Sequence, residues 1–201
     1  MAGGRLGILG GTFDPPHVGH LSLARAAYTQ LRLERVLWVL TADPPHKQRQ
    51  RLSPAGDRLA LVQAALAGEP AFTLSRVDLD RPGPHWAADT VRLLAEQYPD
   101  APLIYLMGGD SLRDLPRWDR PLEFLRWCRL GVWRRPGAVV DLEALEMALP
   151  GLAAKVEWVD LPPQAIASQD IRRRVQQGAS VADLVPAAVA RLIAARGLYR
   201  E

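Results

Sequence analysis

One loop constrains the fold of this 201-residue chain more than any other stretch. It runs from Gly10 to His20, reads GGTFDPPHVGH, and lies between the apolar run 6–9 and the amphipathic run 21–33. This order predicts a buried strand, a glycine-rich loop and a helix over 20–33. Glycines let a ligand approach the backbone because no Cβ intervenes, and the free N–H groups of a helix start attract phosphate. The loop is therefore predicted to bind an anion.

The rest of the chain continues this alternation of strand and helix. The apolar run 36–40 predicts a second strand, and strand, helix and strand in this order form a βαβ unit of a parallel sheet. Further strands are expected at 72–77, 103–107, 130–133 and 156–161. Further helices are expected at 53–66, after the loop 83–90, and at 122–127, 141–149, 168–177 and 189–196. Ser53 and Ser168 are expected to cap two of them. The alternation predicts an α/β fold with a doubly wound parallel sheet.

The unusual loops follow the carboxyl ends of the expected strands. They lie at 10–20, 43–47, 108–111, 134–137 and 164–170. In doubly wound sheets, ligands bind beyond the carboxyl ends of the strands, where the strand order reverses. The four histidines also lie in loops, at His17, His20, His46 and His85. Both patterns predict one ligand site at this edge of the sheet.

Composition narrows the classes of function. The chain has 25 Lys and Arg against 22 Asp and Glu, a modest basic excess that suits either a polyphosphate substrate or nucleic acid. The arginines are scattered among acidic neighbours, so we expect no nucleic-acid partner. No apolar run reaches the length of a membrane span, and the N-terminus lacks a secretory signal. Cys128 is the only cysteine, which predicts a cytoplasmic protein without disulfides or a cysteine metal site.

The loop at 10–20 resembles the signature GGxFDPxHxGH of the nucleotidyltransferase superfamily with an (H/T)xGH motif, in the form found in bacterial nicotinate mononucleotide adenylyltransferases. The resemblance extends from Leu6 to about Arg174. It implies a single Rossmann-like nucleotidyltransferase domain over 1–201, with an ATP-phosphate helix and a small helical end after 164. The implied reaction transfers AMP from ATP to nicotinate mononucleotide in NAD biosynthesis. The implied cofactor is Mg²⁺ held through the ATP phosphates, without a protein metal ligand.

The resemblance also implies which residues contact ATP. His17 and His20 would meet the phosphates, and His20 would stabilise the charge that develops. A second family signature, I-S-S-T-x-I-R, appears here as IASQDIR from Ile166 to Arg172. Ala167 and Gln169 depart from it and leave fewer hydroxyl donors. The expected catalytic residues are His17, His20 and Arg172. The expected ATP-binding residues are Gly10, Gly11, Thr12, His17, His20, Gly108, Asp110, Arg135, Ile166, Ser168 and Arg172.

Shorter segments resemble the acceptor side of the family. The residues 44–47 read PPHK, and Gly108-Gly109-Asp110 is followed by Trp118, whose flat ring would stack on a pyridine. In the segment 83–90, a tryptophan and an alanine replace the family's Tyr and Thr. The expected mononucleotide-binding residues are Phe13, Asp14, His46, Lys47, His85, Trp86, Ala87 and Trp118.

Several alternatives remain open at this point. Nicotinamide mononucleotide is the nearer alternative acceptor, and a phosphopantetheine-type adenylyltransferase is the alternative within the superfamily. A basic nucleic-acid-binding module and a regulatory homologue with weakened ATP binding are the other two. His17 and His20, three residues apart, could also face one metal ion, although the sequence offers no convincing third ligand. Both a monomer and a homo-oligomer are compatible with the sequence, and no membrane partner is expected.

Overall fold

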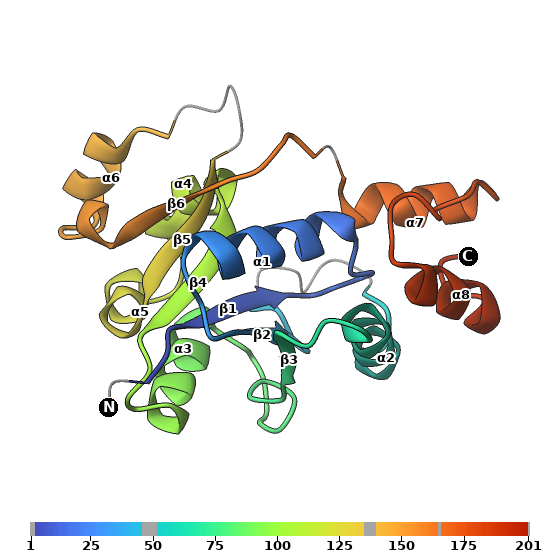
Figure 1. Ribbon diagram of the computed structural model, residues 1–201, viewed down its shortest axis with the longest axis horizontal. Coiled ribbons are helices and arrows are strands. Elements are labelled where there is room, and N and C mark those ends of the chain that lie inside the picture. Colours follow the sequence, from blue (N-terminus) through green and yellow to red (C-terminus); the bar gives the residue numbers. More distant parts are fainter. Residues whose placement is uncertain (1–2, 46–51, 135–139, 165, 201) are drawn as a thin grey trace.

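A six-stranded parallel sheet forms the centre of the computed structural model, which describes residues 3–45, 52–134, 140–164 and 166–200 (Figure 1). The strands are β1 (Leu6–Gly11), β2 (Arg35–Leu40), β3 (Phe72–Ser75), β4 (Leu103–Gly108), β5 (Arg129–Arg134) and β6 (Val156–Asp160). Their order is β3-β2-β1-β4-β5-β6, and every neighbouring pair is parallel. The order reverses between β1 and β4, which confirms the predicted doubly wound sheet.

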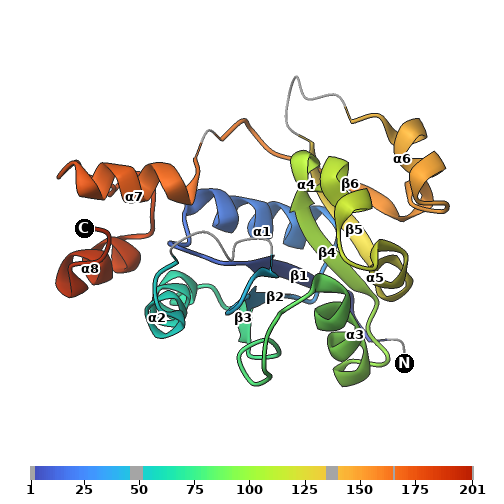
Figure 2. The ribbon, with the colours of Figure 1, turned by 180° about the vertical axis from the view of Figure 1, so that it is seen from behind.

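Helices connect the strands and cover both faces of the sheet. They are α1 (Val18–Gln30), α2 (Ala55–Leu66), α3 (Ala87–Gln97), α4 (Gly109–Asp114), α5 (Pro121–Trp127), α6 (Leu142–Ala148), α7 (Ser168–Gln176) and α8 (Ala187–Arg196), with 3-10 helices η2 (Leu115–Arg117) and η3 (Ala153–Lys155). Helix α1 lies on one face, and α3 and α5 lie on the other (Figures 1 and 2). Because both faces are covered, the central strands are continuous apolar runs.

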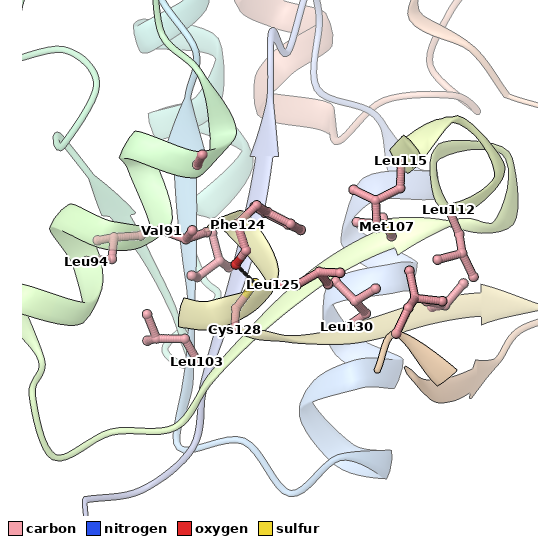
Figure 3. Close-up of a cluster of buried hydrophobic side chains, with 14 of the residues drawn as sticks. Val91, Leu94, Leu103, Met107, Leu112, Leu115, Phe124, Leu125, Cys128 and Leu130 are labelled. Atoms are coloured by element: carbon pink, nitrogen blue, oxygen red, sulfur yellow. Dashed lines mark hydrogen bonds between the residues drawn. The ribbon is translucent and has the colours of Figure 1, made fainter. Parts of the chain in front are cut away.

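The core has one apolar cluster on each face of the sheet. Figure 3 shows the cluster under α3, α4 and α5, where Leu94, Phe124 and Leu130 are fully buried. The single cysteine, Cys128, lies in this cluster and donates to the Phe124 carbonyl at 3.5 Å. The cluster on the other face gathers the buried side of α1 around Trp38 of β2. Burial in apolar surroundings is typical of a structural, unreactive thiol.

A third cluster joins the C-terminal helices to the sheet domain. Leu61 and Ala65 of α2 pack with Ile171 of α7 and with Val189 and Ile193 of α8. Figures 1 and 2 both show α7 and α8 together at one end of the sheet, with α8 next to α2. Two helices, α7 and α8, thus follow residue 164, and α2 holds them to the sheet domain.

The observed element boundaries differ from the predicted ones at helix starts. Helix α1 begins at Val18 instead of His20, and Pro54 and Ala167 are the N-cap residues of α2 and α7 in place of the predicted serines. The prediction of two serine caps was therefore wrong. The Ser168 hydroxyl instead donates to the carbonyl of Pro15, a contact that spans 153 residues and that local sequence cannot indicate.

A side chain of α1 closes the end of the edge strand β6. The Gln30 Nε2 donates to the Asp160 carbonyl at 2.8 Å, and the Asp160 N–H donates to Gln30 Oε1 at 2.9 Å. The side-chain amide therefore satisfies both main-chain groups of this residue, as a neighbouring strand would.

Candidate active site

Two histidines stack at the beginning of α1, beyond the carboxyl end of β1. The rings of His17 and His20 lie 3.7 Å apart between centroids at an interplanar angle of 29°. The backbone N–H of His17 donates to His20 Nδ1 at 3.2 Å, so the neutral His20 ring carries its proton on Nε2. Burial lowers the pKa of His17 to about 4, because desolvation disfavours the charged ring. His17 is therefore an uncharged imidazole at neutral pH.

Two glycines of the loop allow close contacts. A Cβ on Gly10 would lie 2.5 Å from the hydroxyl oxygen of Tyr105, and a Cβ on Gly19 would lie 3.0 Å from His17 Nδ1. Real Cβ atoms essentially never occur at the first distance, so a side chain at position 10 would displace the hydroxyl end of the Tyr105 side chain. Neighbouring side chains therefore give a reason for glycine at both positions, in addition to the close approach of the predicted ligand.

The side chains of Phe13 and Asp14 point into the protein. Phe13 is 1% exposed, stacks on Trp38 at 4.9 Å and adopts a positive φ of 46°. Asp14 is also 1% exposed, and its carboxylate accepts from the Ser53 N–H at 3.1 Å and from the Tyr199 hydroxyl at 2.8 Å. Both side chains fix the shape of the loop. Their expected contact with the mononucleotide stays a prediction.

Helix α7 lies against this loop, so the two halves of the predicted ATP site meet. The Ser168 hydroxyl donates to the Pro15 carbonyl at 2.9 Å, and Arg172 Nη1 donates to the Asp14 carbonyl at 2.7 Å. The site thus brings together the start of α1, a hydroxyl and a guanidinium. The backbone N–H groups of a helix start, a hydroxyl and a guanidinium are all hydrogen-bond donors suited to phosphate oxygens.

Arg58 holds three active-site segments together and was not identified from the sequence. Its side chain is fully buried in α2, and burial lowers its pKa although Asp14 acts in the opposite direction. The guanidinium donates to four carbonyls, those of Ser53, Thr12, Thr41 and Ala42, at 2.9, 3.1, 2.9 and 2.7 Å respectively. A buried cation needs such partners. Apart from the Ser53 bond, which spans five residues, these contacts join segments distant in sequence, so no local pattern indicates them.

A cavity of about 510 Å³ lies beside the switch point of the sheet. Four predicted mononucleotide residues line it, namely His85, Trp86, Ala87 and Trp118, together with Gly10 of β1. Its other lining residues are Val39, Thr41, Pro45, Asp78, Thr90, Tyr105, Ser111, Asp114, Arg117 and Asp119. A concave site with an aromatic wall and a few polar groups is typical of a small-molecule pocket.

His85 shapes the wall of this cavity. Its Nδ1 accepts from the Asp43 N–H at 2.9 Å, and its Nε2 donates to the Arg81 carbonyl at 3.2 Å. Both ring nitrogens therefore bind backbone groups. The ring joins the loop after β2 to the loop before α3, which supports a positioning role for this histidine.

Asp78, Thr90 and Tyr105 also line the cavity, although the sequence analysis did not identify them. Asp78 is 2% exposed and accepts from Thr90 Oγ1 at 2.8 Å and from Arg81 Nη2 at 2.8 Å. Tyr105 lies 6.0 Å from the Trp118 ring in an edge-to-face arrangement. Burial raises the pKa of the Tyr105 hydroxyl, so it stays protonated and can donate to a ligand in the cavity.

The remaining predicted residues are divided between the site edge and undescribed segments. Gly108 ends β4, and Asp110, in the first turn of α4, is exposed and pairs with Arg113. Ile166 packs against the C-terminal cluster before α7. The predictions for His46, Lys47 and Arg135 fall outside the described residues.

The residues around the ATP half of the site do not form a metal-ligand set. Within the described ranges, no group of three or more His, Cys, Asp or Glu residues lies close enough together to hold a metal ion. The side chains at the site offer imidazole, hydroxyl and guanidinium groups, whereas Mg²⁺ prefers oxygen ligands and usually keeps its waters and substrate phosphates. This chemistry fits an ion that arrives with a polyphosphate.

The fold and the site together define a protein of the doubly wound parallel nucleotide-binding class, with one half whose donors suit phosphate and one aromatic half. Residues 8–174 match the family model described as cytidylyltransferase-like. A nicotinate-nucleotide adenylyltransferase of Thermomicrobium roseum is 46% identical over 98% of this chain and 92% of its own length. The corresponding protein of Gloeobacter violaceus is 44% identical over 98% and 97% of the two chains.

Solved structures show the same fold. The Plasmodium falciparum nicotinic acid mononucleotide adenylyltransferase complexed with NaAD superposes with a TM-score of 0.80 over 98% of both chains, at 16% identity. The chain therefore belongs to the cytidylyltransferase-like family, among the nicotinate-nucleotide adenylyltransferases.

Proposed function

We propose that the protein transfers the adenylyl group of ATP to nicotinate mononucleotide and releases pyrophosphate and nicotinate adenine dinucleotide. One observation carries this proposal. The loop 10–20 meets α7 through the Ser168 and Arg172 contacts, and Gly10 at the start of the same loop lines a cavity with aromatic walls. Relatives over the full chain carry the name of this activity. A site for one triphosphate and a neighbouring flat ring is what such a transfer needs.

The reaction requires alignment and charge stabilisation more than a base. A phosphate oxygen of the mononucleotide attacks the α-phosphorus of ATP and forms the new P–O bond. The bond to the bridging oxygen of the β-phosphate breaks, and its electron pair leaves with pyrophosphate. The acceptor is already an anion at neutral pH, so positioning and electrostatics supply most of the rate. We assign no covalent nucleophile, and Cys128 is buried away from the loop with a pKa that burial raises to about 12.

His17, His20, Ser168 and Arg172 are the groups that we assign to the phosphates. Arg172 supplies positive charge, and the Ser168 hydroxyl is at the first turn of α7. His20 Nδ1 accepts from the His17 backbone N–H, which places the proton of the neutral ring on Nε2, and we assign this N–H to the phosphates. His17, uncharged because of its lowered pKa, supplies a neutral hydrogen-bonding ring at the start of α1, where the helix dipole favours anions.

Mg²⁺ would be held through the ATP phosphates, with no protein ligand assigned to it, and would supply positive charge that offsets the charge of the phosphates. The chain's own part is to hold the phosphates between α1 and α7. The predicted contacts of Gly10, Gly11, Thr12, Gly108, Asp110, Ile166 and Arg135 with ATP belong to this proposal.

The pyridine ring of the acceptor is assigned to the cavity wall at Trp118. Helix α3 begins in the same wall, and its N-cap residue Trp86 makes no side-chain cap. The first N–H groups of α3 are therefore available to a carboxylate, which the helix dipole also favours. Ala87 offers no hydroxyl there. His46 and Lys47 remain predicted contacts of the acceptor phosphate.

A direct assay separates the candidate acceptors. The purified protein is incubated with Mg²⁺–ATP and with nicotinate mononucleotide, nicotinamide mononucleotide, phosphopantetheine or no acceptor, and released pyrophosphate is measured. We expect the highest kcat/KM with nicotinate mononucleotide. A higher value with the amide would overturn the assignment of the carboxylate to α3, and pyrophosphate release only with phosphopantetheine would overturn the function.

The cellular setting is also part of the proposal. Within the described ranges, no helix combines the length and apolar character needed to cross a bilayer. We infer a cytoplasmic enzyme whose partners are ATP and a pyridine mononucleotide. The expected absence of a nucleic-acid partner stays a prediction, and duplex titration at rising salt tests it, since phosphate-driven binding weakens steeply with salt.

A further inference from the structure

The C-terminal turn of the chain reaches the loop at the other end of the sequence. The Tyr199 hydroxyl donates to Asp14 Oδ1 at 2.8 Å, across 185 residues. Helix α8 ends at Arg196 with Gly197 as its C-cap residue, and Tyr199 follows with a positive φ of 65° that turns the chain back. Figures 1 and 2 show this end of the chain close to α7, α8 and α2.

Three groups lie within 4 Å of the carboxylate of Asp14, and the positive charge of Arg58 also acts on it. Tyr199 serves one oxygen, whereas the other oxygen accepts from the Ser53 N–H at 3.1 Å and lies 3.9 Å from Arg172 Nη1. The carboxylate is 1% exposed, so water cannot replace a lost donor. A buried charge that loses a partner either moves toward another donor or carries an uncompensated desolvation cost.

Movement of Asp14 would move the phosphate site. Its main-chain carbonyl accepts from Arg172, and the next carbonyl, that of Pro15, accepts from Ser168. His17, two residues further on, is the N-cap of α1. The position of one buried carboxylate therefore sets the spacing between the loop, α1 and α7.

We propose that Tyr199 is a positioning residue of the adenylyl-transfer site, whose hydroxyl fixes Asp14 and thereby holds the loop that leads into His17 against α7. This inference rests on the proposed function for its kinetic readout. It gives the C-terminal turn a role in arranging the phosphate ligands without contacting a substrate itself.

The fold should survive the loss of this hydroxyl, because Arg58 anchors the other side of the loop. Its bonds to the carbonyls of Thr12, Thr41 and Ala42 do not involve Tyr199. The apolar contacts of the Tyr199 ring with the C-terminal cluster also remain in phenylalanine. Tyr199→Phe therefore removes the hydroxyl, with its hydrogen bond to Asp14 and its interaction with the Ser53 side chain, and keeps the packing of the ring.

The test compares Tyr199→Phe with Arg196→Ala. Arg196 is the last residue of α8, three residues before Tyr199. Its side chain pairs with Asp57 at 2.7 Å and not with Asp14, so it is the matched control. We expect Tyr199→Phe to lower kcat/KM for ATP by about ten- to a hundredfold, because small displacements of positioning groups have effects of this order. Arg196→Ala should stay within about twofold of the parent, as exposed ion pairs contribute little.

A positioning role and a general loss of stability change kcat and the two KM values differently. Positioning predicts a lower kcat and a higher KM for ATP, with the KM for nicotinate mononucleotide unchanged. Unchanged kinetics in Tyr199→Phe would overturn the proposal, and so would a lower kcat with both KM values unchanged, which indicates only a smaller folded fraction. Thermal unfolding of both variants measures that fraction.

A second measurement does not depend on turnover. Calorimetric titration with Mg²⁺–ATP and no acceptor should show weaker ATP binding in Tyr199→Phe and parental binding in Arg196→Ala. If the parent protein releases no pyrophosphate with any acceptor, the proposed function fails while the titration still decides on Tyr199. Equal ATP affinities in the parent and Tyr199→Phe would overturn the inference.

Should Tyr199→Phe fail to fold, the titration of Asp14→Asn decides. Weaker ATP binding in this variant would support the inference, and parental binding would overturn it.

Discussion

The buried, uncharged His17 makes the stability of this protein depend on pH in a specific window. In the unfolded chain the ring takes up a proton near pH 6.5, whereas burial lowers the pKa in the folded protein to about 4. Between these values the unfolded state binds more protons, so the free energy of unfolding falls as the pH falls. The stability is fully present above pH 6.5 and is lost progressively down to pH 4.

The two pKa values give the size of the effect. Linkage over the range from pH 7 to pH 4.5 predicts that His17 alone lowers the free energy of unfolding by about 2.5 kcal/mol. The perturbation is His17→Gln, which keeps a polar side chain of similar reach and cannot titrate. Urea unfolding of both proteins at half-unit pH steps gives the two pH profiles.

The difference between the profiles isolates His17, because the carboxylates titrate in both proteins. We expect the parent to lose about 2.5 kcal/mol more than His17→Gln between pH 7 and pH 4.5. Parallel profiles would refute the reasoning and would mean that the ring is protonated, and so solvated or paired, in the folded protein.

Three further predictions concern the site. His20→Ala should lower kcat by about a hundred- to a thousandfold with a smaller change in the KM for ATP, because the ring acts on charge that develops in the transition state; steady-state kinetics test this, and an unchanged kcat contradicts the role. Trp118→Ala should raise the KM for the pyridine mononucleotide about five- to tenfold and spare that for ATP, since stacking is lost; equal effects on both KM values would exclude stacking. Ala167→Ser should raise the free energy of unfolding by about 1 kcal/mol through a side-chain cap on α7, without weakening ATP binding in a titration; weaker binding would exclude the assigned place of α7.

The strands were predictable because each is a short apolar run between turn residues. Val36–Leu40 and Leu103–Met107 are buried on both faces by helices, and their sequence shows no polar alternation for that reason. The carboxyl-end loops followed from the same pattern, and the structure brings the start of α1 and the start of α7 together as predicted.

The contacts that shape the site were less predictable. Asp14 was assigned to the mononucleotide, yet its carboxylate binds Tyr199 and Ser53 inside the protein. Ser168 was assigned as a cap, and it bonds to the distant Pro15 instead. A single sequence shows spacing along the chain but not which segments meet in space. Three of the four hydrogen bonds of Arg58, and the bond from Tyr199 to Asp14, join segments distant in the sequence. A buried arginine in an amphipathic helix offers only the hint that a charge interrupts an apolar face.

The amide of Gln30 has a consequence for how copies of this protein can associate. An edge strand normally offers unpaired main-chain groups on which a strand of another molecule can add. At Asp160 both of these groups are already bonded within the same chain. Assembly by joining two sheets at this end of β6 would first have to displace a glutamine, so the arrangement protects the rim of the sheet against self-association.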